Sequence, residues 1–169
     1  GRCGSGTTVD ITEGMLWAAG GSIPGVPANP TPARVINLSI GGPGECSAFE
    51  QEAFDEALSR GALVVVSAGN DNDNADGYSP ASCYGVSTVV ATDPYGYRAS
   101  YSNYSAYADI SAPGGDSNRY SETDGVLSTV DASSSAPSGS YDYGWKNGTS
   151  MAAPHVTGVG SLMLSVNPS

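Results

Sequence analysis

The residues best suited to chemistry lie near the end of the chain, in the run Asn147-Gly-Thr-Ser-Met-Ala-Ala-Pro-His-Val156. The apolar pattern predicts a helix over residues 150–166, with Ser150 in its first turn. A helix N-terminus carries unpaired N–H groups and the positive end of the helix dipole, which stabilise an oxyanion that forms beside it. Ser150 is therefore a candidate nucleophile. The plain alternative is that Thr149 and Ser150 only cap the helix.

A serine nucleophile needs a base to accept its proton and a carboxylate to orient that base. The only histidine of the chain is His155, five residues after Ser150. On a helix, this offset turns the imidazole to a different face from the hydroxyl. We therefore do not expect His155 to act as the base.

The elements that must position Ser150 form an alternating pattern. Residues 34–39 are a short β-branched run, and Ser47 and Glu50 form a capping box that opens a helix ending at Gly61. The run 62–67 is apolar on both faces, as in a central parallel strand. Strand, helix and strand in this order predict a parallel sheet with a right-handed crossover. The other elements that we expect are a helix over 8–19, a strand over 86–91, shorter strands near 97–101, 108–111 and 126–130, and a surface hairpin or loop over 131–146.

Composition excludes several classes of function. The 169 residues include 6 Lys and Arg against 17 Asp and Glu, which gives a formal net charge of −11. Binding to nucleic acid or to an anionic membrane surface needs a basic face, and six scattered cations cannot build one. No apolar stretch approaches the length of a membrane span. The first methionine, Met15, lies inside a helical pattern, so we expect a processed piece of a longer precursor.

The three cysteines, Cys3, Cys46 and Cys83, fit no metal-ligand spacing. In an oxidising compartment one pair would form and the third cysteine would bond elsewhere. If Cys46 pairs with Cys83, Cys3 needs a partner outside this chain. In the cytosol all three would be free, buried thiols. The sequence leaves both interpretations open.

Six motifs resemble one known family, in the order of that family. The segment Gly148-Thr-Ser-Met-Ala-Ala-Pro-His155 resembles the nucleophile motif of the subtilisin-like serine proteases (subtilases), most closely the proteinase K branch and related secreted bacterial enzymes. The resemblance implies an α/β fold with three layers, in which helices flank a mostly parallel central sheet that is incomplete here. Residues 1–169 would be the C-terminal part of a single catalytic domain. The other matching segments are Val35-Ile-Asn-Leu-Ser-Ile-Gly-Gly42, Val64-Val-Val-Ser-Ala-Gly-Asn70, Ser79-Pro-Ala-Ser82, Tyr101-Ser-Asn-Tyr104 and Asp109-Ile-Ser-Ala-Pro-Gly114.

The resemblance also implies roles for individual residues. Ser150 would be the nucleophile of a secreted endopeptidase that works through an acyl-enzyme, and the side-chain amide of Asn70 would stabilise the oxyanion together with the Ser150 N–H. The substrate would be a protein or peptide, bound at the S1 pocket between two short segments. One wall of that pocket would be Ser39, Ile40 and Gly41, and the other Ala68 and Gly69.

The family's catalytic Asp and His lie upstream of every motif found here. We therefore expect them on an N-terminal part of the same protease, present as a second chain or cut away, and joined to Cys3 by a disulfide. Two other interpretations remain. A sedolisin-type acid peptidase has a similar serine motif, but it carries Asp where Asn70 stands. A non-catalytic subtilase-like binding or structural module would lack the upstream His or Asp.

We expect no organic cofactor, and one possible structural metal. The acidic loop Asp71–Gly77 is not an EF-hand, because Ala75 and Ser82 occupy ligand positions. In the proteinase K branch, a carboxylate and two main-chain carbonyls bind calcium, and the matching residues here are Asp109, Tyr84 and Val86.

The loop after Asn70 bears on substrate preference. Asp71, Asp73 and Asp76 could favour cationic substrate residues, Tyr78 could shape the floor of the pocket, and an apolar, open pocket is the simpler expectation. Three N-x-S/T sequons, including Asn103-Tyr-Ser105, are interpreted as chance.

Overall fold

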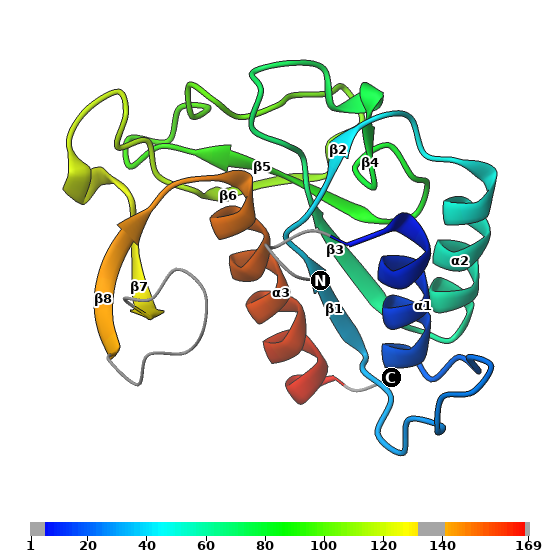
Figure 1. Cartoon of the computed structure of the whole chain (residues 1–169). Coiled ribbons are helices and arrows are strands. Elements are labelled where there is room, and N and C mark those ends of the chain that lie inside the picture. The colour runs from blue at the N-terminus through cyan, green and yellow to red at the C-terminus, as the bar shows by residue number, and fades with distance from the viewer. Residues whose placement is uncertain (1–5, 132–140, 168–169) are drawn as a thin grey trace.

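The computed structural model describes residues 6–131 and 141–167 and shows a mixed α/β fold (Figure 1). Its centre is a four-stranded sheet in the order β1-β3-β5-β6, with every neighbouring pair parallel. The bounds are Val35–Leu38 for β1, Leu63–Ser67 for β3, Ser87–Thr92 for β5 and Ile110–Pro113 for β6. The predicted parallel sheet is confirmed.

Helices cover both faces of this sheet, which gives the three layers expected. Helices α1 (Thr8–Ala18) and α2 (Ala48–Ser59) lie on one side, and α3 (Thr149–Val166) lies on the other (Figure 1). The capping box of α2 is present as predicted: Ser47 accepts from the Glu50 N–H, and the Glu50 carboxylate accepts from the Ser47 N–H. Helix α2 ends at Ser59, and the chain leaves the helical path at Gly61, whose φ of 81° favours glycine.

Strand β3 is central because its two faces serve two different cores. Val64 and Val66 pack with Met15 and Phe54 beneath α1 and α2. Val65 points the other way and packs with Ala152 and its neighbours on α3. All three valines are fully buried. The alternation of side chains along a strand therefore explains why this run is apolar at every position.

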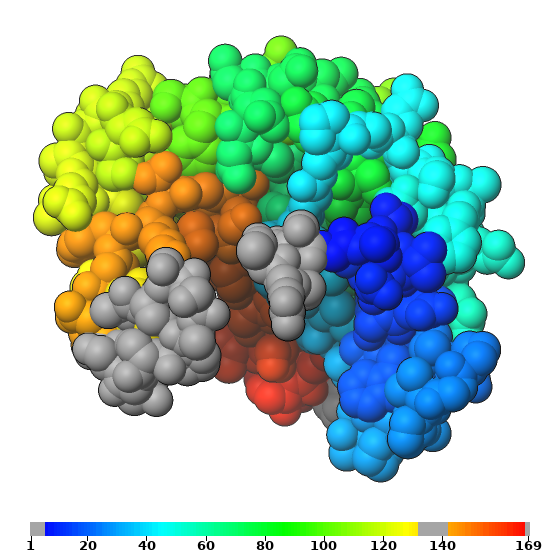
Figure 2. All heavy atoms as spheres, in the orientation of Figure 1, coloured from blue at the N-terminus to red at the C-terminus, as the bar shows by residue number. Residues whose placement is uncertain are grey.

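The face that α3 turns to the sheet is narrower than the sequence suggests. Ala152, Ala153 and Gly160 are buried, and a Cβ added at Gly160 would lie 2.8 Å from a Leu63 methyl group, so glycine permits the close approach. An adjacent stripe of larger residues is exposed, and the red end of the helix lies at the surface in Figure 2. That stripe consists of Val159, Leu162, Met163 and Val166.

Two small antiparallel ladders complete the described part of the chain. Strand β2 (Gly42–Pro43) pairs with β4 (Tyr78–Ser79), after the one-turn 3₁₀ helix η2 (Ala75–Gly77). Strand β7 (Val126–Asp131), preceded by the 3₁₀ helix η3 (Glu122–Asp124), pairs with β8 (Tyr141–Lys146). The hairpin interpretation of 131–146 thus holds for β8, and residues 132–140 lie outside the described residues.

The prediction of a strand near residues 97–101 is wrong. Only an isolated bridge joins Thr92 to Arg98. The buried Asp93 side chain accepts from the N–H groups of Tyr95 and Tyr97, 2.9 Å each, and so holds residues 93–97 as a turn, while Ser102 N donates to Ala99 O at 3.0 Å in a second turn. Its aromatic residues are typical of strands, but here a side-chain carboxylate takes the backbone donors that a strand would use.

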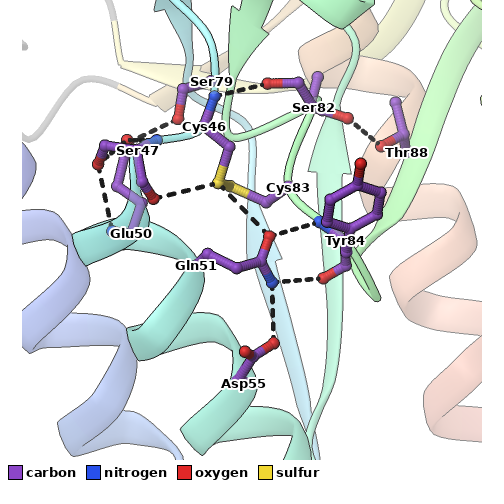
Figure 3. Close-up of a disulfide and its surroundings, with 11 residues drawn as sticks. Cys46, Ser47, Glu50, Gln51, Asp55, Ser79, Ser82, Cys83, Tyr84 and Thr88 are labelled. Carbon is purple, nitrogen blue, oxygen red and sulfur yellow. Dashed lines mark hydrogen bonds between the residues drawn. A yellow bond between two sulfur atoms is a disulfide. The ribbon is translucent and has the colours of Figure 1, made fainter.

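Cys46 and Cys83 form a disulfide across 37 residues (Figure 3). It joins the segment that enters α2 to the turn before β5. Gln51 ties the same two segments a second time, because its amide accepts from Tyr84 N at 2.8 Å and donates to Tyr84 O at 3.1 Å. The oxidised pair is confirmed, and Cys3 lies outside the described residues.

Among residues 6–131 and 141–167, no helix is long and apolar enough to cross a bilayer.

Candidate active site

Ser150 lies where parallel strands of the sheet end. It is the second residue of α3, and it stands beside the segments that follow β1 and β3. The carboxyl ends of parallel strands are the usual place for a ligand site in such a sheet. Residues that are distant in sequence therefore meet at one edge of the sheet.

The Ser150 side chain and Ser39 make a reciprocal contact. The Ser150 hydroxyl donates to Ser39 O over 3.3 Å, and the Ser39 hydroxyl donates to Ser150 O at 2.9 Å. The first contact is long for an O–H donor, so the nucleophile candidate is only weakly engaged. Ser150 is half-buried. As the second residue of the helix, its N–H has no acceptor within α3.

Asn70 is held by the residue next to Ser150. Both the N–H and the hydroxyl of Thr149 donate to Asn70 Oδ1, at 2.8 and 2.9 Å, and Gly69 N donates to the Thr149 hydroxyl at 3.2 Å. Because both Thr149 groups that face Asn70 donate, the atom that they meet must be the amide oxygen. The Asn70 NH₂ group therefore points away from Thr149, and it donates to no residue in the described part of the chain.

The helix-capping alternative for Thr149 and Ser150 is wrong. The N-cap residue is Gly148, with a φ of 155° that favours glycine and no side-chain cap. Thr149 is fully buried, and its hydroxyl serves Asn70 and Gly69 rather than the first turn of its own helix. The local sequence pattern indicates only a helix cap at Thr149 and not this contact with Asn70.

A cleft of about 690 Å³ opens in front of Ser150. Most of the residues predicted for the catalytic and substrate-binding site line this cleft. Other residues that line it were not indicated by any sequence pattern. The predicted ones are Ser39, Ile40, Gly41, Gly69, Asn70 and Ser150, and the additional ones include Thr8, Ile11, Thr12, Pro43, Phe54 and Pro80. Ala68 is fully buried and is not among the lining residues of the described chain.

The charged groups on this cleft are acidic. Its charged lining residues are Glu50 and Asp71, and Tyr78 also lines it, whereas Asp73 and Asp76 do not line the cleft in the described chain. Burial raises the pKa of the Tyr78 hydroxyl, and the charges of Asp71 and Asp73 raise it further. Tyr78 is therefore a neutral hydroxyl donor at ordinary pH.

Glu50 is charged despite its partial burial. Desolvation raises the pKa of this carboxyl, but hydrogen bonds from Ser79 and Ser47 outweigh it, so the net pKa lies below the usual value. Its two oxygens accept from the Ser79 hydroxyl at 2.6 Å and from the Ser47 N–H at 2.9 Å (Figure 3). Glu50 thereby joins the start of α2 to β4 along the wall of the cleft.

His155 lies apart from this arrangement. Its side chain is exposed, and Nδ1 lies 2.8 Å from Met151 O on the same helix. The ring is therefore engaged with its own backbone, in agreement with the expectation from its offset to Ser150.

The chain is similar to known proteins over its whole length. The Peptidase S8 model, described as the subtilase family, matches residues 1–169. This chain belongs to the subtilase family. It is 48% identical over 168 residues to an extracellular protease of Xanthomonas campestris pv. campestris, covering 99% of this chain and 27% of that protein. It is 48% identical over 165 residues to an extracellular basic protease of Dichelobacter nodosus, covering 98% of this chain and 26% of that protein.

A solved structure of proteases from Pseudoalteromonas arctica superposes with a TM-score of 0.93 at 50% identity, covering 97% of this chain and 48% of that chain. This subtilase chain thus spans about a quarter of those curated relatives and about half of that solved chain.

The calcium residues predicted for this subtilase chain have oxygen donors that would suit the ion. Asp109 Oδ2 accepts from Thr88 N at 2.8 Å, and Tyr84 O accepts from Gln51 at 3.1 Å, so each also has a protein partner. Carboxylate and carbonyl oxygens keep further lone pairs for a hard cation. Among the described residues no group of three or more His, Cys, Asp or Glu is arranged to hold a metal. The set of Asp109, Tyr84 and Val86 stays a prediction.

Proposed function

We propose that this chain is the part of a secreted serine endopeptidase that supplies the nucleophile and the oxyanion site. The observation that carries the proposal is the bonding of Thr149 to Asn70 directly beside Ser150, which leaves the Asn70 NH₂ and the Ser150 N–H unengaged next to a hydroxyl on a cleft. Membership of the subtilase family and the names of the relatives support the same chemistry.

In this mechanism Ser150 Oγ attacks the carbonyl carbon of the scissile peptide bond, and its proton passes to a histidine base. The negative charge that develops on the carbonyl oxygen is stabilised by the Asn70 amide and the Ser150 N–H. The C–N bond then breaks as the base returns the proton to the leaving amine, and an acyl-enzyme forms on Ser150. Water attacks the acyl-enzyme and regenerates the hydroxyl. The extended substrate would pair with the backbone near Gly41.

The base and its orienting carboxylate would come from an N-terminal part of the same protease. Support comes from the sequence, in which His155 is the only histidine, and from the engagement of that ring with Met151 O. We further propose that Cys3 bonds to that part. Mass spectrometry of the native protein under reducing and non-reducing conditions tests this bond, and a homogeneous 17 kDa species with a free Cys3 would exclude it.

The function is tested with the protease as encoded, together with the N-terminal part proposed above. Hydrolysis of casein and of a peptide p-nitroanilide is compared for the wild type and for Ser150→Ala. Activity that requires Ser150 supports the proposal, and a folded full-length protein that hydrolyses neither substrate supports the non-catalytic alternative. Asn70 and the match to the subtilase family favour a subtilisin-like enzyme over a sedolisin.

We also propose that Asp109 and the carbonyls of Tyr84 and Val86 hold a structural calcium ion. The ion would fasten the turn before β5 to the start of β6, next to the Cys46–Cys83 disulfide. Thermal unfolding with excess calcium and with a chelator tests this. A chelator-dependent fall in Tm that is absent from Asp109→Asn supports the site, whereas a calcium-insensitive wild type contradicts it.

A further inference from the structure

Asn103 has no function in the chemistry above, yet its side chain is bonded to the loop that carries Asn70. The amide is fully buried. Its NH₂ group donates to Ala68 O at 3.0 Å, and its oxygen accepts from Asp71 N at 2.9 Å and from Asp73 N at 3.0 Å. One side chain therefore holds the loop backbone both before and after Asn70.

The backbone around Asn103 follows the same loop. Asn103 N donates to Gly69 O at 2.9 Å, Asn72 N donates to Tyr101 O at 2.8 Å, and Tyr104 N donates to Asp73 O at 3.0 Å. Gly69 has a φ of 106°, and a Cβ added there would lie 2.3 Å from Asn103 Nδ2. Gly69 thus lets the loop approach the Asn103 amide closely.

Two buried residues therefore act on Asn70 from different sides. Thr149 fixes the amide oxygen, and Asn103 fixes the backbone on either side of it. An oxyanion donor is effective only when it is placed in advance where the charge develops, and a misplacement of about 1 Å can cost about 10²-fold in rate. We propose that Asn103 is a positioning residue that aims the Asn70 amide at the oxyanion, an inference that rests on the proposed function.

Ser102 provides a matched control for this proposal. It is the neighbouring residue and is equally buried, but its hydroxyl accepts from Ala91 N at 3.0 Å on β5 and donates to the main-chain Asn103 O at 2.9 Å, so neither of these bonds goes to the Asn70 loop. Ser102→Ala thus removes two buried side-chain hydrogen bonds and leaves the bonds of the Asn103 side chain to that loop in place. If buried polar bonds near the site matter only for stability, variants at Ser102 and Asn103 should behave alike.

The test is a double-mutant cycle in the full-length protease. Asn103→Ala, Asn70→Ala, the double variant and Ser102→Ala are compared by kcat, KM, the Ki of a peptide boronic acid and Tm, and each concentration is set by active-site titration. We expect Asn103→Ala to lower kcat by about 10- to 100-fold and to raise the Ki of the boronic acid by a similar factor. KM should stay within about threefold of the wild-type value. In the Asn70→Ala background the same substitution should change kcat by less than about threefold.

If Asn103→Ala lowers kcat equally in the wild-type and Asn70→Ala backgrounds, the proposal is overturned. The proposal is also overturned if Asn103→Ala lowers Tm but leaves kcat unchanged, which is the result expected for Ser102→Ala. If Asn103→Ala does not fold, Asn103→Asp keeps the side-chain size and enters the same cycle. Failure of both variants to fold would favour a purely structural role. If the wild type is inactive, or if Ser150→Ala is active, it is the proposed function that fails rather than the inference about Asn103.

Discussion

The two halves of the candidate active site are prepared to different degrees. On the side of Asn70, Thr149 and Asn103 make six hydrogen bonds of 2.8–3.2 Å that involve a side chain, either with the Asn70 side chain or with the loop backbone around it. On the side of Ser150, the hydroxyl has a single hydrogen bond to the described residues, of 3.3 Å to Ser39 O. The same sheet edge thus holds a fixed candidate oxyanion donor and a weakly engaged candidate nucleophile.

This difference teaches which part of the catalytic machinery the chain builds by itself. An oxyanion site must be rigid before the reaction, because its benefit depends on dipoles that need no rearrangement. A serine hydroxyl must instead donate its proton to a base, and a strong bond to another acceptor would compete with that base. A weak contact between the Ser150 hydroxyl and Ser39 O is therefore expected if the base comes from an N-terminal part of the protease.

The largest effect should come from Ser150 itself. In the full-length protease, Ser150→Ala should lower kcat by about 10⁶-fold, the loss found when the nucleophile of a related enzyme is removed. The control is Ser161→Ala, an exposed serine on the same helix, which should stay within about twofold of the wild type. A Ser150→Ala variant with a tenth of the normal peptidase activity would contradict the assignment of the nucleophile.

The second largest loss of activity should come from Asn70, which lies on the side of the site that hydrogen bonds hold in place. Asn70→Ala should lower kcat by about 10²–10³-fold with little change in KM, as found for one oxyanion-hole donor in a related enzyme. The charge to be stabilised exists only in the transition state, so binding of the ground-state substrate should change little. Initial rates over a range of peptide concentrations separate the two constants. A rise in KM at constant kcat would instead place Asn70 in substrate binding.

A smaller loss is expected from Thr149→Val, which keeps the shape of the side chain but removes its hydroxyl. The N–H bond to Asn70 remains, whereas the hydroxyl loses its bond to Asn70 Oδ1 and the bond that it accepts from Gly69 N. The bond that acts on the Asn70 side chain contributes about 1–1.5 kcal/mol, which corresponds to a loss of close to tenfold in kcat. Thr157→Val is a control on the same helix, since the Thr157 hydroxyl bonds to Ala153 O and Asn37. Equal activity of wild type and Thr149→Val would show that the backbone N–H alone orients Asn70.

The smallest effect should appear in stability rather than in rate. The folded-state pKa of Glu50 lies below its ordinary value of 4.5, so the carboxylate stabilises the fold above that pH. This contribution is lost as the pH falls through the lowered pKa. Glu50→Gln should therefore have a lower Tm than the wild type at pH 7, and the difference should shrink by pH 3. A constant difference across this range would exclude the charge as its source.

Sequence reasoning predicted the features that local pattern determines. The capping box of Ser47 and Glu50, the apolar run of β3 and the helix predicted from residue 150, which begins at residue 149, all follow from spacing within a few residues. The position of Ser150 in the first helical turn made it a candidate nucleophile, but its pairing with Asn70 came from the family resemblance, since no local rule joins residues 80 positions apart.

The features that could not be predicted depend on contacts between distant segments. Asn103 was interpreted as part of a chance sequon, because only the folded chain brings it against Ala68 and Asp71. The residues of α1 that line the cleft were missed because helical spacing shows which face is apolar but not what that face meets. The prediction of a strand near residues 97–101 failed for the same reason, since the Asp93 side chain accepts from Tyr97 N in place of a neighbouring strand.

The central claim is that Ser150 is the nucleophile beside a prepared oxyanion site. Its most direct test is covalent labelling of the active full-length protease with a fluorophosphonate, followed by peptide mapping. The account predicts one phosphonyl group per molecule on the Ser150 hydroxyl, at a rate that falls strongly in Asn70→Ala because the phosphonyl oxygen occupies the oxyanion site. Labelling of a different serine in the active enzyme, with Ser150 unmodified, would contradict it.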